Sequence, residues 1–160
     1  MSETFDVAEL VQLAVEDEKT GVAFYGVLAE RTVNPALRTL FQELQKQERG
    51  HQKRFEDMLD ALGGVTVHEQ YSGEYALYLH ALTEGRAFPN ETTGRRLAAQ
   101  CHGDRDAVNL ASQFERDTLI LMNEMRSLVP LKDRAIVEEL TREEQSHLVA
   151  LAEARKQLGD

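Results

Sequence analysis

Apolar residues recur every three or four positions along most of this 160-residue chain. This spacing places them on one face of a helix and is typical of amphipathic α-helices. Only three prolines and ten glycines interrupt the pattern. The sequence therefore predicts an all-α protein, as one domain over residues 1–160, with long helices over residues 5–31 and 35–62, from Asp104 to a break at Pro130, and over 131–158.

Local signals mark the ends of these helices. Asn34 can cap a helix with its side chain, and Pro35 is tolerated at the first helical position. Gly63 and Gly64 can supply the left-handed backbone that ends the second helix. Asp104 is a candidate cap for the third.

The segment between the second and third long helices has a looser pattern. From residue 65 to residue 103 it reads as a connection, with short helices expected over "EYALYLHALTEGRAF" and "TGRRLAAQC". A bundle about 40 Å tall needs such a long crossover if the connection runs its whole length. The prediction is thus two helical hairpins joined by a crossover, rather than four helices joined by short loops.

Ionisable residues interrupt the apolar face of every long helix, where a core residue would be expected. Two of the helices carry one glutamate there, and the other two carry the motif Glu-x-x-His, within "QERGHQ" and "EEQSHL". Each motif places its two side chains on one helix face, about 4.5 Å apart along the axis. The candidate site residues are Glu18, Glu48, His51, Glu115, Glu144 and His147.

The loop positions predict that these glutamates lie level with one another. In an antiparallel helix pair, residues equally far from the loop centre have the same height. Glu18 and Glu48 each lie 15 residues from Val33, the centre of the first loop. Glu115 and Glu144 each lie 14.5 positions from the centre of the second. The two hairpins therefore look like duplicates of one plan.

This arrangement is that of ferritin-like di-iron proteins, in which two helices give one Glu each and two give Glu-x-x-His. Four carboxylates crowded into a desolvated core would repel one another, and two divalent cations would cancel that charge. Oxygen and imidazole ligands without thiolate favour iron or manganese, with zinc possible. We expect two Fe ions per chain, with glutamates bridging and capping them and histidines as terminal ligands.

Nearly the whole chain resembles the rubrerythrin branch of the ferritin-like superfamily. The resembling stretches are "AVEDEKTGVAFY", "LQKQERGHQKRF", "EYALYLHALTEGRAF", "LASQFERDTLILM" and "VEELTREEQSHLVAL". The resemblance implies a ferritin-like four-helix bundle, a non-haem di-iron centre, often a homodimer, and chemistry with hydrogen peroxide or dioxygen.

Two features depart from rubrerythrins proper. Those proteins carry a rubredoxin-like domain with four cysteines, whereas this chain has Cys101 alone. Electrons would therefore come from an external donor such as a rubredoxin-like protein. Rubrerythrins also carry an extra glutamate one turn after the ligand on the third helix, where this chain has Thr118. The seventh ligand associated with fast peroxide reduction is thus missing.

Other polar residues are assigned from their positions. Tyr25 lies two turns beyond Glu18 on the same face, so it either packs in the core or forms a hydrogen bond or redox partner beside the metals. Gln47 is a candidate partner for the second ring nitrogen of a ligand histidine. Periodicity places Glu16 and Asp17 in a solvated face. A buried or partly buried thiol is expected at Cys101, and surface or packing roles at His68, His80 and His102.

Three functions fit these observations. The leading hypothesis is a di-iron oxidoreductase that reduces hydrogen peroxide or dioxygen. The alternatives are a ferroxidase or iron-handling protein without a reductase cycle, and a non-catalytic helical interaction module. The formal net charge of -10 argues against nucleic acid and anionic membranes as partners. No long apolar run or signal peptide is evident, so a cytoplasmic location is expected.

Overall fold

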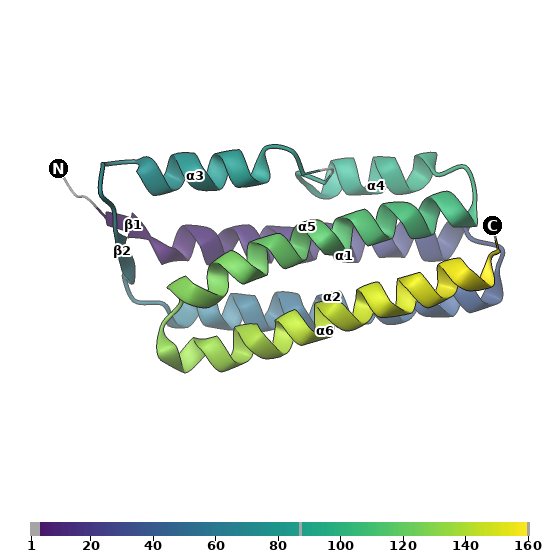
Figure 1. Ribbon diagram of the computed structural model, residues 1–160. Helices are drawn as coiled ribbons and strands as arrows, with labels where there is room; N and C mark the ends of the chain where they lie inside the picture. The colour runs from purple at the N-terminus through teal and green to yellow at the C-terminus, as the bar shows by residue number, and fades with distance from the viewer. Residues whose placement is uncertain (1–3, 87, 160) are drawn as a thin grey trace.

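The protein is a bundle of four long helices flanked by two short ones (Figure 1). The computed structural model describes residues 4–86 and 88–159. The all-α, ferritin-like architecture predicted from the sequence is confirmed. The helices are α1 (Val7–Arg31), α2 (Pro35–Ala61), α3 (Glu74–Thr83), α4 (Glu91–Gln100), α5 (Asp104–Leu128) and α6 (Leu131–Gln157).

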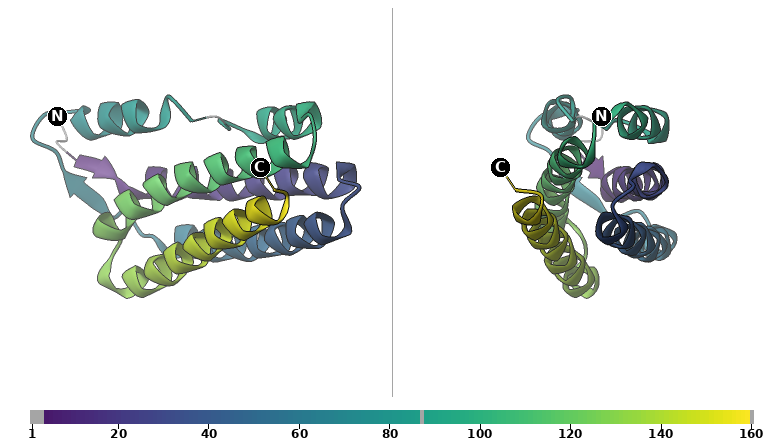
Figure 2. Two further views of the ribbon diagram at one scale, coloured as in Figure 1. Left: turned by 45° about the vertical axis from the view of Figure 1, so that its right-hand side comes forward. Right: turned by 90° about the vertical axis from the view of Figure 1, so that its right-hand side faces the viewer.

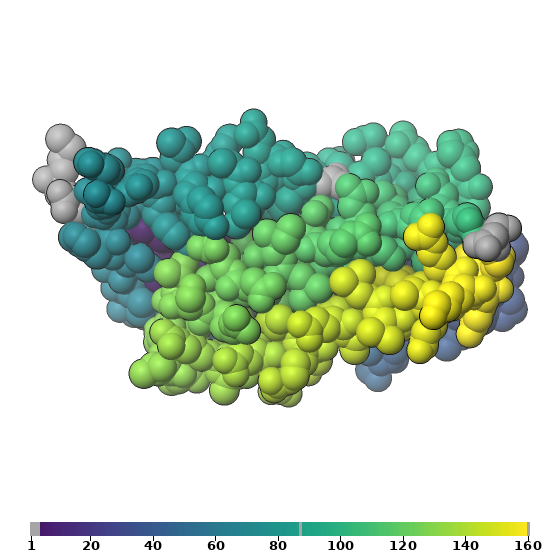
Figure 3. Space-filling view, in the orientation of Figure 1, coloured from purple at the N-terminus to yellow at the C-terminus, as the bar shows by residue number. Residues whose placement is uncertain are grey.

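Two hairpins and a crossover build the bundle. Helices α1 and α2 form one hairpin, α5 and α6 form the other, and each pair packs along its length. Helices α3 and α4 lie end to end along one side of the bundle, and α4 packs against α1 (Figures 1 and 2). In the space-filling view, side chains of α5 and α6 cover the middle and lower part of the front face, and those of the crossover cover the upper part (Figure 3). Among the described residues, no helix combines the length and apolarity needed to cross a membrane.

A small two-stranded sheet closes one end of the bundle, and the sequence did not predict it. Strands β1 (Thr4–Asp6) and β2 (Thr66–His68) pair antiparallel, with Phe5 opposite Val67. The helix predicted over 5–31 therefore begins at Val7, where the Asp6 side chain accepts a hydrogen bond from the Ala8 N–H. This pairing joins residues far apart in sequence, so local periodicity could not reveal it.

The predicted helix boundaries are otherwise close to those observed. The side chain of Asn34 caps α2 and Pro35 is its first residue, as predicted. Asp104 does not cap α5. Instead it is the first residue of that helix, and its carboxylate accepts a hydrogen bond of 2.7 Å from the Thr32 hydroxyl. This bond ties the start of α5 to the loop of the first hairpin.

The crossover contains both short helices, with shifted limits. The helix predicted over 74–88 stops at Thr83, because Gly85 and Pro89 follow and neither favours a helix interior. Ala87, which falls within that predicted helix, lies outside the described residues. The other short helix begins after Asn90, whose side chain accepts a hydrogen bond from the Thr93 N–H.

The core consists of two apolar clusters, one toward each end of the bundle. The first gathers buried residues such as Leu10, Phe55 and Leu140, and the second gathers Phe24, Phe41 and others. All six ionisable residues of the candidate site are buried, and along each long helix they fall between the residues of the two clusters. The apolar clusters thus enclose a polar centre at mid-height.

The packing of the first cluster generates a test of the fold. Phe55 of α2 is fully buried in it. We expect Phe55→Ala to lower the free energy of unfolding by about 3–5 kcal/mol, because the truncation leaves a cavity. Chemical denaturation of the metal-free protein measures this change. Lys46→Ala, on the exposed side of the same helix, is the matched control. A loss below about 1 kcal/mol at Phe55 would contradict this packing.

Candidate metal centre

The structure brings all six predicted residues together in the middle of the bundle. They fall into two overlapping groups, and within each group one ligand atom per residue lies within 4.8 Å of the others. The first group is Glu18, Glu48, His51 and Glu144, and the second is Glu48, Glu115, Glu144 and His147. We call these position A and position B. Each has four oxygen and nitrogen donors.

Glu48 and Glu144 belong to both positions, so they are placed to bridge two ions. They come from α2 and α6, the helices that also carry the histidines. Glu18 of α1 and Glu115 of α5 belong to one position each and are placed as terminal ligands. The sequence predicted glutamates as bridges and caps, and the structure now distinguishes which residues are positioned for each role.

The two histidines face the carboxylates with the same ring nitrogen. His51 Nδ1 lies 2.5 Å from Glu144 Oε1, and His147 Nδ1 lies 3.0 Å from Glu144 Oε2 and 3.3 Å from Glu48 Oε1. The two rings are nearly parallel, with centroids 5.5 Å apart and an interplanar angle of 11°. The centre is therefore pseudo-symmetric, with one imidazole for each position.

Unpartnered polar atoms line this centre and fit a metal. Both carboxylate oxygens of Glu18, Glu48 and Glu144 are buried without a hydrogen-bond partner, as are Nδ1 of His51 and Nδ1 of His147. Such atoms are costly to bury unless a cation or proton compensates them. Their convergence is what a pair of divalent ions requires.

Electrostatics in the metal-free centre reflects the same crowding. Burial, followed by the charge of Glu144, raises the pKa of Glu48 and of Glu115 well above the usual range. Burial also raises the pKa of Glu18. Burial opposes ionisation of Glu144 too, but its close ionic contacts with His147 and His51 outweigh this effect and lower its pKa. Protons therefore occupy this centre when metals do not.

The outer nitrogens of the histidines have partners on the opposite hairpin. His147 Nε2 donates to Gln47 Oε1 at 2.8 Å, which confirms Gln47 as a histidine partner. His51 Nε2 donates to Glu143 Oε2 at 2.7 Å, a contact that the sequence analysis missed. Glu143 precedes Glu144 just as Gln47 precedes Glu48, so the internal duplication could have revealed it. These bonds orient both rings so that Nδ1 points at the centre, where a metal would replace its proton.

Tyr25 serves both of the roles considered for it. It is fully buried among aromatic side chains, where its ring lies 6.2 Å from those of Phe41 and Phe114. Its hydroxyl donates a hydrogen bond to Glu115 Oε1. Burial and the charge of Glu115 raise the pKa of Tyr25 well above its ordinary value, so the phenol keeps its proton.

The prediction that Asp17 lies in a solvated face is wrong. Asp17 is buried, and its carboxylate accepts a hydrogen bond of 2.6 Å from Thr118 and one of 3.0 Å from Arg86 Nη1. Burial raises its pKa to about 6, although Arg86 and Thr118 oppose the shift. Periodicity failed here because α5 and α4 also pack against α1, so that more than one face of this helix is buried. Glu16, its neighbour, is exposed as predicted.

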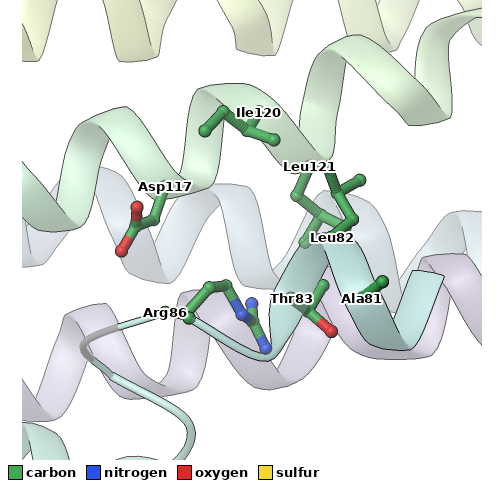
Figure 4. Close-up of a pocket in the computed structure, with 8 residues that line it drawn as sticks. Ala81, Leu82, Thr83, Arg86, Asp117, Ile120 and Leu121 are labelled. Carbon is green, nitrogen blue, oxygen red and sulfur yellow. The ribbon is translucent and has the colours of Figure 1, made fainter. Parts of the chain in front are cut away.

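Arg86 also lines a surface pocket of about 220 Å³. In Figure 4, Asp117, Ile120 and Leu121 from α5 face Leu82 and neighbouring residues at the end of α3, with Arg86 from the following linker beneath them. None of the six clustered residues lines this pocket. Through its ion pair, Arg86 links this pocket to the buried Asp17 and Thr118.

The remaining predictions for single residues agree with the structure. The side chains exposed to solvent include His68, His80 and His102. Cys101 is partly buried, and its thiol donates to the Leu97 carbonyl oxygen at 3.5 Å. None of these residues belongs to either metal-type group.

The protonation of the centre predicts how metal binding depends on pH. Burial alone would lower the pKa of His51, but the close contact with the negatively charged Glu144 carboxylate raises it to about 9, from 6.5. A metal must displace this proton. Affinity for Co²⁺ should therefore rise as pH increases from 6 toward 9, by about tenfold per pH unit for each proton released.

Calorimetric titration at several pH values, in two buffers of different ionisation enthalpy, measures the affinity and counts the protons. The exposed-site variant His80→Ala should show the same profile. An affinity that does not change over this range would contradict the protonated state of the metal-free centre.

The buried ion pair predicts a further stability effect. Arg86→Ala leaves the Asp17 carboxylate buried without its cation, which should lower the free energy of unfolding by about 3–5 kcal/mol. Thermal or chemical denaturation measures this loss. Adding Asp17→Asn should restore part of it, since the neutral amide needs no counter-charge. If the double variant is no more stable than Arg86→Ala, the loss does not come from this pair.

Comparisons with known proteins agree with this geometry. A crystal structure of a Thermotoga maritima protein, described as a ferritin-like diiron-carboxylate protein, superposes with a TM-score of 0.72 at 22% identity, over 98% of both chains. At that identity the likeness supports the fold. No curated protein matches the chain. The family model for rubrerythrin matches residues 9–155. The chain therefore belongs to the rubrerythrin family.

Proposed function

We propose that this protein is a non-haem di-iron oxidoreductase that reduces hydrogen peroxide or dioxygen with electrons from an external donor. The observation that carries the proposal is the buried centre, in which unpartnered atoms of four glutamates and two histidines converge. Membership of the rubrerythrin family supports it. Oxygen and imidazole donors without thiolate suit iron, with manganese or zinc as other candidates.

The chain would hold the two ions in a pseudo-symmetric frame built from two similar hairpins. Glu48 and Glu144 would bridge, while Glu18 and Glu115 would be terminal ligands. With iron bound, each ferrous ion would supply one electron, and together these reduce hydrogen peroxide with two protons to two waters, or dioxygen to peroxide.

Side chains around the centre orient the ligands and exclude bulk water. Tyr25 fixes Glu115 through its hydroxyl and keeps an O–H group beside the site. Apolar clusters at both ends shield the centre, in which each of the six ligands is almost fully buried. This dry surrounding strengthens the electrostatic interactions of whatever charge forms there.

Re-reduction requires a second protein. The chain has a single cysteine, so it cannot build the four-thiolate iron site of a rubredoxin-like domain. We propose that a separate rubredoxin-like protein supplies the electrons.

One observation favours a second candidate, a ferroxidase or iron-handling protein. Thr118 stands where rubrerythrins carry an extra glutamate, and it binds Asp17 rather than facing the centre as a ligand. A centre without that carboxylate has fewer anionic groups to retain ferric iron. The two candidates differ in whether iron stays in the protein after it is oxidised.

Anaerobic reconstitution with ferrous iron tests the leading proposal. We expect about two ions per chain by elemental analysis and an oxidation by peroxide or oxygen, followed by stopped-flow absorbance, that is faster than that of free ferrous iron. The double variant Glu48→Gln, Glu144→Gln removes both bridging charges while keeping side-chain size, so bound iron and fast oxidation should both be lost. The exposed pair Glu138→Gln, Glu153→Gln is the matched control.

The same sample distinguishes the two candidates. Iron that survives desalting after oxidation, and repeated peroxide consumption when a rubredoxin and its reductase are added, support the oxidoreductase. Iron released after oxidation supports iron handling. An iron-loaded protein that neither oxidant oxidises faster than free iron would rule out both.

A further inference from the structure

The two metal positions have histidines with chemically different partners. His51, in position A, donates its Nε2 hydrogen to the carboxylate of Glu143 at 2.7 Å. His147, in position B, donates to the neutral amide oxygen of Gln47 at 2.8 Å. Each partner sits one residue before a bridging glutamate and reaches across to the opposite hairpin. The two contacts have the same geometry, but a carboxylate accepts the hydrogen bond in one and a neutral amide accepts it in the other.

A carboxylate partner makes an imidazole a stronger ligand than an amide partner does. It draws the Nε2 hydrogen toward itself and so increases the electron density on Nδ1, the atom that faces the centre. Arg54 holds Glu143 in place, with Nη1 3.4 Å from its Oε1, and is itself held by Glu139 at 2.9 Å. Glu143 is therefore held in position beside His51.

The terminal glutamates of the two positions also differ, in the hydrogen bonds that they accept. Glu115 of position B already accepts a hydrogen bond from the Tyr25 hydroxyl, which withdraws charge from one of its oxygens. Glu18 of position A has no hydrogen-bond partner on either oxygen among the described residues. No hydrogen bond therefore competes with an ion in position A for either oxygen of Glu18.

We propose that the two positions are inequivalent and load in order, with position A binding a divalent ion first and more tightly. The inference rests on the proposed two-metal site but not on its reaction. Glu143 and Gln47 act as positioning residues, since each reaches a metal only through a histidine. Their difference sets the order of binding, and Tyr25 adds to it by weakening Glu115.

Titration of the metal-free protein with Co²⁺ tests the order. Calorimetry should show two binding steps that differ by about tenfold or more. In crystals soaked with one equivalent, anomalous scattering should place most of the cobalt beside His51. Glu143→Gln keeps the hydrogen bond but removes the charge, so the first step should weaken by about 10-fold. Gln47→Glu should tighten the second step.

Together, Glu143→Gln and Gln47→Glu distinguish an effect on metal affinity through the histidines from a purely structural role. A structural role predicts that both substitutions weaken binding, whereas our proposal predicts a loss in Glu143→Gln and a gain in Gln47→Glu. Glu138→Gln, which removes an exposed charge from the same helix, should change neither step. Thermal denaturation of each metal-free variant checks that the fold is retained.

Several outcomes would overturn the inference. Equal cobalt occupancy at one equivalent, preference for the His147 side, or an unchanged first step in Glu143→Gln would each do so, while leaving a two-metal site intact. Failure to bind any cobalt or ferrous iron would overturn the two-metal site itself, and with it both proposals.

Discussion

Four glutamates and two histidines lie buried at the centre of a helical bundle, and the rest of the structure depends on compensating their charge. An isolated carboxylate in such a place would be too costly, so it must be protonated, paired or bound to a cation. In the metal-free protein the histidines hold protons against Glu144, and three glutamates have raised pKa values. Two divalent ions would replace those protons, which agrees with the membership of the chain in the rubrerythrin family.

The frame that holds this centre comes from two hairpins of the same design. Each hairpin brings one single glutamate and one Glu-x-x-His motif to the same height, and the residue before each motif reaches across to the histidine of the other hairpin. Crossed contacts of this kind couple the hairpins through polar groups as well as through apolar packing. The two crossed contacts differ in one residue type, since Glu143 occupies in one hairpin the place that Gln47 occupies in the other.

The crossover does more than connect the hairpins. Its linker supplies Arg86, which pairs with buried Asp17, and α4 packs against α1. Thr118 completes this group from α5. Helix α1 therefore packs against the crossover as well as against α2 and α5. Arg86 also lines the surface pocket, so the crossover links that pocket to the buried Asp17 and Thr118.

The sequence by itself determined the four long helices, the start of α2 at Asn34 and Pro35, and the meeting of six ligand-type residues. These follow from periodicity and from distances to the loops, which are local quantities. Only the tertiary structure decided the strand pairing of Phe5 with Val67, the burial of Asp17, and which acceptor each histidine faces. Those features depend on contacts between segments far apart in the chain, and on helix faces buried by more than one neighbour, neither of which a helical repeat records.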